Sequence, residues 1–119
     1  MALILIIDDS SFTRKRIANM VEAEGHETLE ASDGRQGLEM TATHSPDCIV
    51  IDLIMPEIDG LELLKLLHNQ GSKIPKIVVT ADIQESVRQE CLERGALAVL
   101  NKPPRKNELQ NALAEALGS

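Results

Sequence analysis

Apolar residues gather along this chain in short unbroken runs, and most of these runs end in a polar residue. The run from Cys48 to Ile51 leads without alternation into Asp52, and similar runs cover residues 2–7, 76–79 and 97–100. An apolar run of this length is typical of a strand buried on both faces, as in a parallel sheet covered by helices. A more polar run at 27–31 predicts a fifth strand nearer the edge of the sheet.

Between these runs lie segments whose apolar residues recur every three or four positions, which predicts helices. We expect helices over about residues 10–24, 35–44 and 61–70, a fourth with Ile83, Val87 and Cys91 on one face, and a last one around 109–117. Ser10 and Ser11 are candidate N-caps of the first. Five strands alternating with five helices predict right-handed crossovers and a three-layer α/β sandwich, with residues 1–119 as a single domain.

Composition narrows the possible functions. Hydrophobic residues make up 43% of the chain, but Phe12 is the only aromatic residue and the formal net charge is −7. A chain without a basic footprint or a stacking platform is not expected to bind nucleic acid directly or to stack a flavin. The opening apolar run is too short to span a membrane and lacks the features of a signal peptide, so we expect a cytoplasmic protein that does not bind membranes. Cys48 and Cys91 are expected to be reduced core thiols.

Polar residues stand where four of the predicted strands end. They are Asp8 with Asp9, Asp52, Thr80 and Lys102. Parallel strands of one sheet end at the same edge, so these side chains can converge on one pocket. Neighbouring carboxylates repel each other unless a divalent cation lies among them, and oxygen ligands without His or Cys favour Mg²⁺. A lysine and a hydroxyl beside them suit a phosphoryl group, so the site is typical of phosphoryl transfer to a carboxylate.

Together these positions resemble a known family. The motifs are Asp8-Asp9, Asp52 followed by Met55-Pro56 and Asp59-Gly60, Thr80-Ala81, and Lys102-Pro103. In this order and at this spacing they resemble the response-regulator receiver domain of two-component signalling, over essentially the whole chain. The resemblance implies a flavodoxin-like fold, with a five-stranded parallel sheet in the order 2-1-3-4-5.

The resemblance also implies a role for each site residue. Asp52 matches the phosphoacceptor, which takes a phosphoryl group from a histidine kinase or a histidine phosphotransfer protein. The implied Mg²⁺ is bound by Asp52, by Asp9 directly, by Asp8 through water, and by the backbone carbonyl of Ile54. The domain would catalyse only its own phosphorylation and dephosphorylation, and would not be an enzyme in the wider sense.

Two more matches complete the implied site. The Thr80 hydroxyl would turn toward the phosphoryl group, and Lys102 would pair with it. A cis bond between Lys102 and Pro103 is expected, since X–Pro bonds lose most of the trans preference and receivers commonly use this one to aim the lysine.

The sequence departs from the family pattern at the switch. Many members carry Tyr or Phe where this chain has Val99, and an aromatic residue where it has Pro104. An aromatic rotamer change therefore cannot report phosphorylation here. We expect the response to involve the face made by the fourth helix, fifth strand and fifth helix, through backbone shifts after Thr80 with Val99 moving little.

Other polar residues are expected to have ordinary roles. Glu57 and Asp59 are predicted turn residues, and the run 14–16 (Arg-Lys-Arg) a solvated helix face, although the first helix can also meet a phosphodonor in this family. Solvated side chains are expected for His26, His44 and His68.

Two alternatives use the same fold or chemistry. A phosphohydrolase of the haloacid dehalogenase type also has an aspartyl nucleophile, but it needs a second Asp two residues later, where this chain has Ile54. A flavodoxin-like electron carrier would need a phosphate-cradling first loop and flanking aromatic residues, whereas residues 8–11 are acidic.

Overall fold

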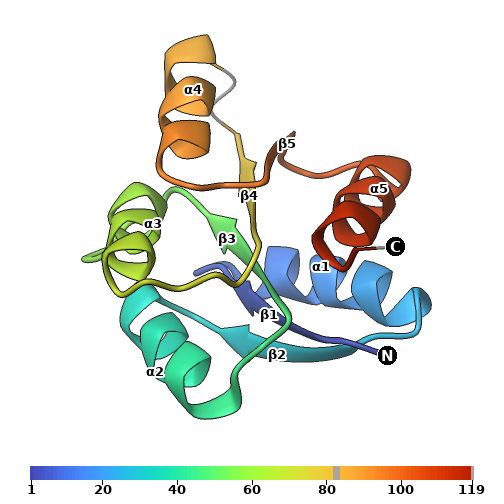
Figure 1. The fold of residues 1–119 in the computed structure, drawn as a ribbon. Helices are drawn as coiled ribbons and strands as arrows, with labels where there is room; N and C mark the ends of the chain where they lie inside the picture. The colour runs from blue at the N-terminus through green and yellow to red at the C-terminus, as the bar shows by residue number, and fades with distance from the viewer. Residues whose placement is uncertain (82–83, 119) are drawn as a thin grey trace.

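The computed structural model describes residues 1–81 and 84–118, which form one parallel sheet in the order β2-β1-β3-β4-β5 (Figure 1). The strands are β1 (Leu3–Ile7), β2 (Glu27–Ala31), β3 (Cys48–Asp52), β4 (Lys76–Thr80) and β5 (Ala98–Asn101). The predicted strand order is confirmed, and β2 lies at an edge, as its polar pattern indicated. Because every pair of neighbouring strands is parallel, all five carboxyl ends meet at one side of the sheet.

Helices cover both faces of the sheet. They are α1 (Ser11–Ala23), α2 (Gly34–His44), α3 (Gly60–Asn69), α4 (Glu85–Glu93) and α5 (Lys106–Ala116). The apolar sides of α1 and α5 pack on one face, and those of α2, α3 and α4 pack on the other (Figure 1). The predicted three-layer arrangement is therefore confirmed. Among the described helices, none has the length and apolar character needed to cross a membrane.

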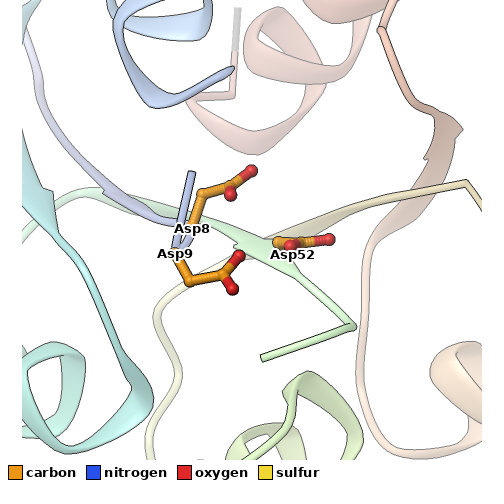
Figure 2. Close-up of side chains that lie close together, drawn as sticks. All are labelled: Asp8, Asp9 and Asp52. Atoms are coloured by element: carbon orange, nitrogen blue, oxygen red, sulfur yellow. The ribbon is translucent and has the colours of Figure 1, made fainter. Parts of the chain in front are cut away.

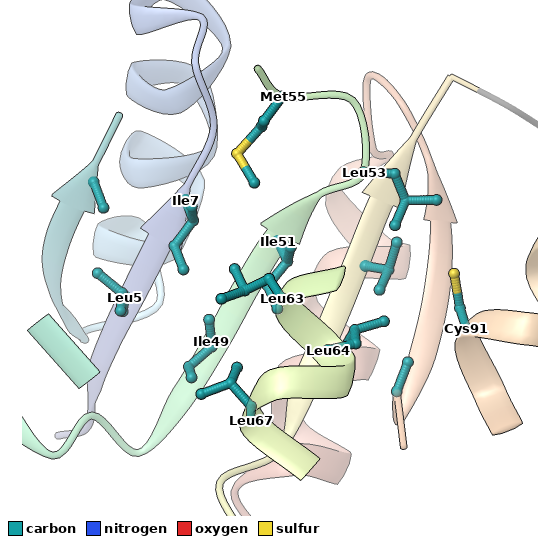
Figure 3. Packing of buried hydrophobic residues seen from close by; sticks show 13 residues of the cluster. Leu5, Ile7, Ile49, Ile51, Leu53, Met55, Leu63, Leu64, Leu67 and Cys91 are labelled. Carbon is teal, nitrogen blue, oxygen red and sulfur yellow. The ribbon is translucent and has the colours of Figure 1, made fainter. Parts of the chain in front are cut away.

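The central strand β3 is buried on both faces, which explains its unbroken apolar pattern. Ile49 and Ile51 point into the core beneath α3, shown in Figure 3, while Cys48 and Val50 belong to the core on the α1 and α5 side. Both core clusters are aliphatic apart from sulfur-containing side chains, and Phe12 is 72% exposed. The expected reduced core thiols are observed, since both cysteines are free and buried.

Local sequence signals set most helix starts. The first three helices begin after residues whose side chains accept a backbone hydrogen bond from three positions on, namely Ser10, Asp33 and Asp59. Ser11 is already the first residue of α1, so this second N-cap candidate is wrong. The predicted position of Ile83 on the fourth helix lies outside the described residues. The predicted last strand is displaced by one residue, because β5 pairs with β4 as far as Asn101, opposite Thr80.

The three histidines differ in their surroundings. His44 and His68 are exposed, as predicted. His26 is half-buried, and its Nδ1 accepts a hydrogen bond from the backbone N–H of Ala2 at 3.2 Å. The prediction of a solvated side chain is wrong for His26, because the start of the chain runs beside the residues that precede β2.

Candidate functional site

Three aspartates meet at the carboxyl edge of the two central strands. Asp8 and Asp9 follow β1, and Asp52 is the last residue of the neighbouring strand β3. One carboxylate oxygen from each lies within 4.8 Å of the other two, and Figure 2 shows the three side chains gathered above the strand ends. The parallel topology thus brings together the acidic residues that the sequence placed at strand ends.

Asp8 is the most deeply buried of the three, at 1% exposure. Its Oδ1 accepts a hydrogen bond of 2.8 Å from the backbone N–H of Ser10. Within the described residues Oδ2 accepts none, although Lys102 Nζ lies 3.2 Å away as an ion-pair partner. The ion pair with Lys102 compensates Oδ2 only in part, since a carboxylate oxygen has lone pairs for more than one partner. Asp8 therefore offers an unsatisfied oxygen to a cation or to a cation's bound water.

Asp52 is 4% exposed, and its Oδ2 accepts a hydrogen bond from Lys102 Nζ at 3.2 Å. Burial and then the negative charge of Asp8 raise the pKa of Asp52, against the opposing effects of Lys102 and the backbone N–H of Ile54. Burial alone would lower the pKa of Lys102, but Asp52 and Asp8 outweigh it and raise that pKa. One ammonium thus does not fully offset two buried carboxylates and their exposed neighbour, which favours a further cation at this edge.

Two further strand ends complete the site. Thr80 ends β4 and is 1% exposed, and its carbonyl oxygen accepts a hydrogen bond of 2.9 Å from the backbone N–H of Lys102. The side chain of Lys102 is 21% exposed and reaches back over the sheet edge to Asp8 and Asp52. The Lys102–Pro103 bond is cis, as predicted. All four predicted strand ends therefore lie at one site.

The loop after β3 packs against the backbone of Asp52. A Cβ on Gly60 would lie 2.6 Å from the Asp52 carbonyl oxygen and 2.6 Å from Leu53 Cα, so only glycine fits here. The Gly60 N–H donates to the Leu53 carbonyl at 2.8 Å. Asp59 caps α3 by accepting from the Glu62 N–H, which agrees with its predicted role as a turn residue.

The residues present fit a magnesium ion. The cluster supplies only carboxylate oxygens, which are the hard ligands that Mg²⁺ binds, and one of them is buried without a donor. Mg²⁺ needs few protein ligands because it keeps several waters. The Ile54 carbonyl as a further ligand stays a prediction.

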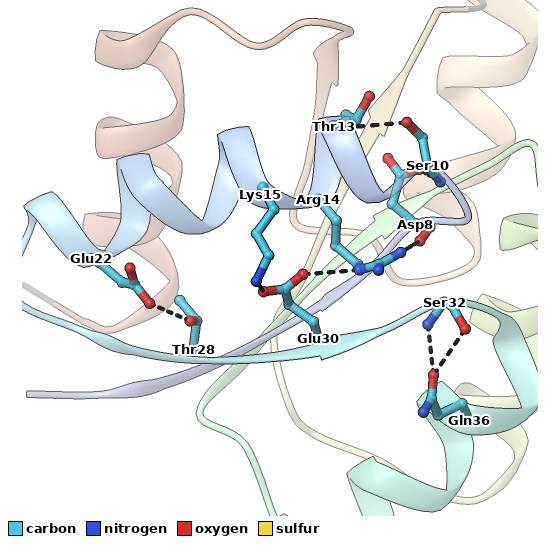
Figure 4. A network of polar contacts seen from close by, with 10 residues as sticks. All are labelled: Asp8, Ser10, Thr13, Arg14, Lys15, Glu22, Thr28, Glu30, Ser32 and Gln36. Carbon is cyan, nitrogen blue, oxygen red and sulfur yellow. Dashed lines mark hydrogen bonds and ion pairs between the residues drawn. The ribbon is translucent and has the colours of Figure 1, made fainter.

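Sequence reasoning missed the role of Arg14. Its side chain is 15% exposed and donates hydrogen bonds to Glu30 Oε1 at 3.0 Å and to the Asp8 carbonyl oxygen at 2.6 Å (Figure 4). Lys15 Nζ binds the other oxygen of Glu30 at 2.8 Å. The predicted solvated face is therefore wrong for Arg14, because β2 lies alongside α1 and supplies an acidic partner. The available signal was Glu30, an acidic residue on the edge strand opposite the apolar Ile6 of β1.

Comparison with known proteins shows where this site occurs. The family model of the response regulator receiver domain matches residues 4–114. "Response regulator MprA" of Mycolicibacterium vanbaalenii is 36% identical over 106 residues, which cover 89% of this chain and 46% of that protein. The receiver domain of the Francisella response regulator 1452 superposes with a TM-score of 0.94 at 31% identity, over 99% of this chain and 98% of the other. Vibrio cholerae chemotaxis protein CheY4 gives 0.90 at 29% identity, over 98% and 99%.

A doubly wound sheet with an acidic cluster at its carboxyl edge defines the class of protein: an α/β domain of the flavodoxin-like fold whose strand edge carries a candidate metal site. Within that class, the chain belongs to the response regulator receiver domain family of two-component systems. The chain spans about half the length of the curated relatives it matches.

Proposed function

We propose that this domain accepts a phosphoryl group on Asp52 from a histidine kinase or a histidine phosphotransfer protein, and changes its partners as a result. Family membership supports phosphoacceptor signalling in general. The observation that supports Asp52 as the acceptor is its place between the Lys102 ammonium, at 3.2 Å, and the acidic pair after β1. Net charge and the absence of a basic footprint support a protein partner, rather than nucleic acid. We also propose a cytoplasmic location.

The proposed reaction needs an ionised Asp52. One of its carboxylate oxygens attacks the phosphorus of the donor, the P–N bond to the donor imidazole breaks, and the imidazole leaves with a proton. Lys102 opposes the rise in the pKa of Asp52 and then pairs with a phosphoryl oxygen, while the Thr80 hydroxyl donates to another. The protein promotes only this change in itself and the later loss of the phosphoryl group, so it is not an enzyme toward other substrates.

Magnesium would be held by Asp8, Asp9, Asp52 and the backbone carbonyl of Ile54. When bound, it would neutralise charge on the phosphoryl oxygens in the transition state. Asp8 and Asp9 would have a separate role: they would hold the positive charge of the ion close to Asp52 without themselves acting as nucleophiles. Asp8 is suited to this, since its Oδ1 is already engaged by the Ser10 N–H.

The test is phosphorylation by acetyl phosphate in the presence of Mg²⁺, followed by intact mass spectrometry. The wild type should gain one phosphoryl group, and Asp52→Asn should gain none. Asp47→Asn is the matched control, because Asp47 precedes β3 at the opposite edge of the sheet. A phosphoryl group that persists on Asp52→Asn would refute the assignment.

A groove beside Lys102 supports a protein as the phosphodonor. It has a volume of about 180 Å³ and is lined by α1 residues, including the exposed Phe12 and the half-buried Met20, and by Pro103 and Pro104. An exposed aromatic side chain at a groove is the kind of anchor that dominates protein interfaces. Phe12→Ala should slow transfer from the cognate kinase about tenfold and leave the rate with acetyl phosphate unchanged. Equal slowing with both donors would contradict docking at this groove.

We propose that the output face is formed by α4, β5 and α5. Val99 in β5 is half-buried, pairs with Val78 of β4 and packs against the core beneath α3. We expect α4 and the backbone after Thr80 to shift on phosphorylation while Val99 keeps its rotamer, although residues 82 and 83 lie outside the described residues. Amide and methyl shifts with and without beryllofluoride test this. A rotamer change at Val99 with α4 unmoved would refute it, and Val99→Tyr should still be phosphorylated.

A further inference from the structure

Asp9 differs from the other acidic residues of the site in how it is held. Its side chain is exposed, and within the described residues its carboxylate has no hydrogen bond or ion-pair partner. Asp8 and Asp52, in contrast, are buried and paired. The position of the Asp9 carboxylate therefore depends on the backbone that carries it.

That backbone is held by the Arg14 side chain. The carbonyl of Asp8 and the N–H of Asp9 belong to one peptide unit, which is planar and rotates as a whole. Arg14 Nη1 donates to the Asp8 carbonyl oxygen at 2.6 Å, and the Asp8 N–H donates to the Ala31 carbonyl at 3.1 Å. A change in ψ of Asp8 would turn this peptide unit, break the bond to Arg14 and move the Asp9 Cα. One guanidinium contact thus sets the direction in which Asp9 leaves the chain.

The guanidinium is itself oriented by Glu30. Arg14 Nε donates to Glu30 Oε1 at 3.0 Å, while Lys15 Nζ binds Oε2 at 2.8 Å. The guanidinium is a rigid planar fork, so contacts at Nε and Nη1 together fix its plane. Both side chains are mostly buried, with exposures of 15% for Arg14 and 23% for Glu30, so solvent screens the pair only in part. Figure 4 shows the chain of contacts running from β2 through α1 to the end of β1.

We propose that Arg14, oriented by Glu30, is a positioning residue for the metal site, which holds the peptide before Asp9 so that the Asp9 carboxylate faces Asp8 and Asp52. This inference rests on the proposed function, because it concerns the Mg²⁺ that the acidic residues would bind. It assigns a function to a contact between α1 and edge strand β2 that takes no part in the chemistry.

Charge and geometry make opposite predictions for this residue, which makes the proposal testable. Arg14 is a cation near a cation site, so removing its charge alone would strengthen Mg²⁺ binding. Removing a residue that orients a ligand weakens metal binding, commonly by 10- to 100-fold. The sign of the change in affinity therefore separates the two effects.

The experiment measures Mg²⁺ dissociation constants by calorimetry and by the amide shifts of residues 8–10, without any phosphodonor. Arg14→Met should raise the dissociation constant about tenfold. Lys15→Met is the matched control. It removes the same charge from the same helix and also removes an ion pair with Glu30, but Lys15 makes no contact with Asp8. Its constant should stay within about twofold of the wild type. An unchanged or lowered constant for Arg14→Met would overturn the proposal.

Two more variants guard against a purely structural effect. Arg14→Lys keeps the charge but cannot contact both acceptors as a fork, so its dissociation constant should also rise, and a wild-type value would overturn the geometric role. Glu30→Ala should weaken binding less than Arg14→Met, and the double variant should bind like Arg14→Met alone. Additive effects would overturn orientation through Glu30. If the wild type itself binds no Mg²⁺, the proposed function fails. If the wild type binds Mg²⁺ and the Arg14 variants bind it equally tightly, the positioning role alone fails.

Discussion

The close approach of Gly60 to Asp52 leads to a sharp prediction for Gly60→Ala. The new methyl group would lie 2.6 Å from the carbonyl oxygen of Asp52 and from the Cα of Leu53, and 2.9 Å from Leu53 Cδ2. Two of these three neighbours are backbone atoms of the strand end that carries the site. They cannot rotate away, so either α3 or the end of β3 must shift.

The magnitude follows from two opposing effects. Overpacking of this kind costs about 1–3 kcal/mol. Replacing glycine by alanine at a helix start returns at most about 1 kcal/mol through chain entropy and helix propensity. We expect a net loss of about 1–2 kcal/mol, which corresponds to a fall in Tm of about 4–8 °C at roughly 4 °C per kcal/mol for a domain of this size. Displacement of Asp52 should also slow its phosphorylation about tenfold, since small misplacements of reacting groups are costly.

Two assays and one control test this reasoning. Thermal unfolding by circular dichroism gives the stability, and acetyl phosphate labelling at a temperature where the variant is folded gives the rate. Gly37→Ala is the comparison variant, because its added methyl would meet only side-chain atoms, chiefly the terminal methyl of Ile7 with Cδ1 at 2.5 Å, and no backbone atom of the site. It can lose a similar amount of stability, about 1–3 kcal/mol, but its phosphorylation rate should stay at the wild-type value because the site backbone is not displaced. A Gly60→Ala protein as stable and as reactive as the wild type would refute the argument.

Three other outcomes follow from the charges and the core. Burial of the Lys76 ammonium lowers its pKa, which shows that the charge is poorly solvated. Lys76→Met should therefore leave the free energy of unfolding in urea unchanged or raise it by up to about 1 kcal/mol. A loss of stability larger than that of Lys73→Met would contradict this. Burial raises the pKa of Cys48 to about 12 from an ordinary 9.0, so the folded state keeps a proton that the unfolded state loses, and stability should fall as pH rises from 9 toward 12. Between pH 8 and 10 the wild type should lose about 1.4 kcal/mol more than Cys48→Ala in urea titrations. Lys102→Met should raise the pKa of Asp52 further, visible as a carboxyl shift that titrates at higher pH than in the wild type, and a lower pKa would contradict the ion pair.

The parts of the fold that the sequence predicts well are those where one local pattern has one structural cause. Four apolar residues before Asp52 predict a strand covered on both faces, and β3 is buried along its whole length. The convergence of Asp8, Asp52 and Lys102 needs only the rule that parallel strands end together. The assignment of roles drew on the family resemblance, since spacing alone does not distinguish one acidic residue from another.

What local patterns could not predict are contacts between distant segments. Arg14 reads as part of a basic helix face, and only the docking of α1 beside β2 turns it inward to Glu30. The local sequence predicts His26 as a polar turn residue, and only the contact with the backbone of Ala2 shows that it is half-buried. Gly60 reads as a turn glycine, but its requirement comes from the Asp52 backbone and not from its own torsion angles.

The site draws on the ends of β1, β3, β4 and β5, from Asp8 near the beginning of the chain to Lys102 near its end. No shorter stretch contains the acidic pair, the acceptor and the lysine together. During synthesis, the chain has its carboxylates long before it has Lys102, so an incomplete copy would lack the ion pair that the proposed acceptor Asp52 makes. The proposed site therefore forms only when the whole sheet has folded, and phosphorylation would select folded, full-length copies of the domain.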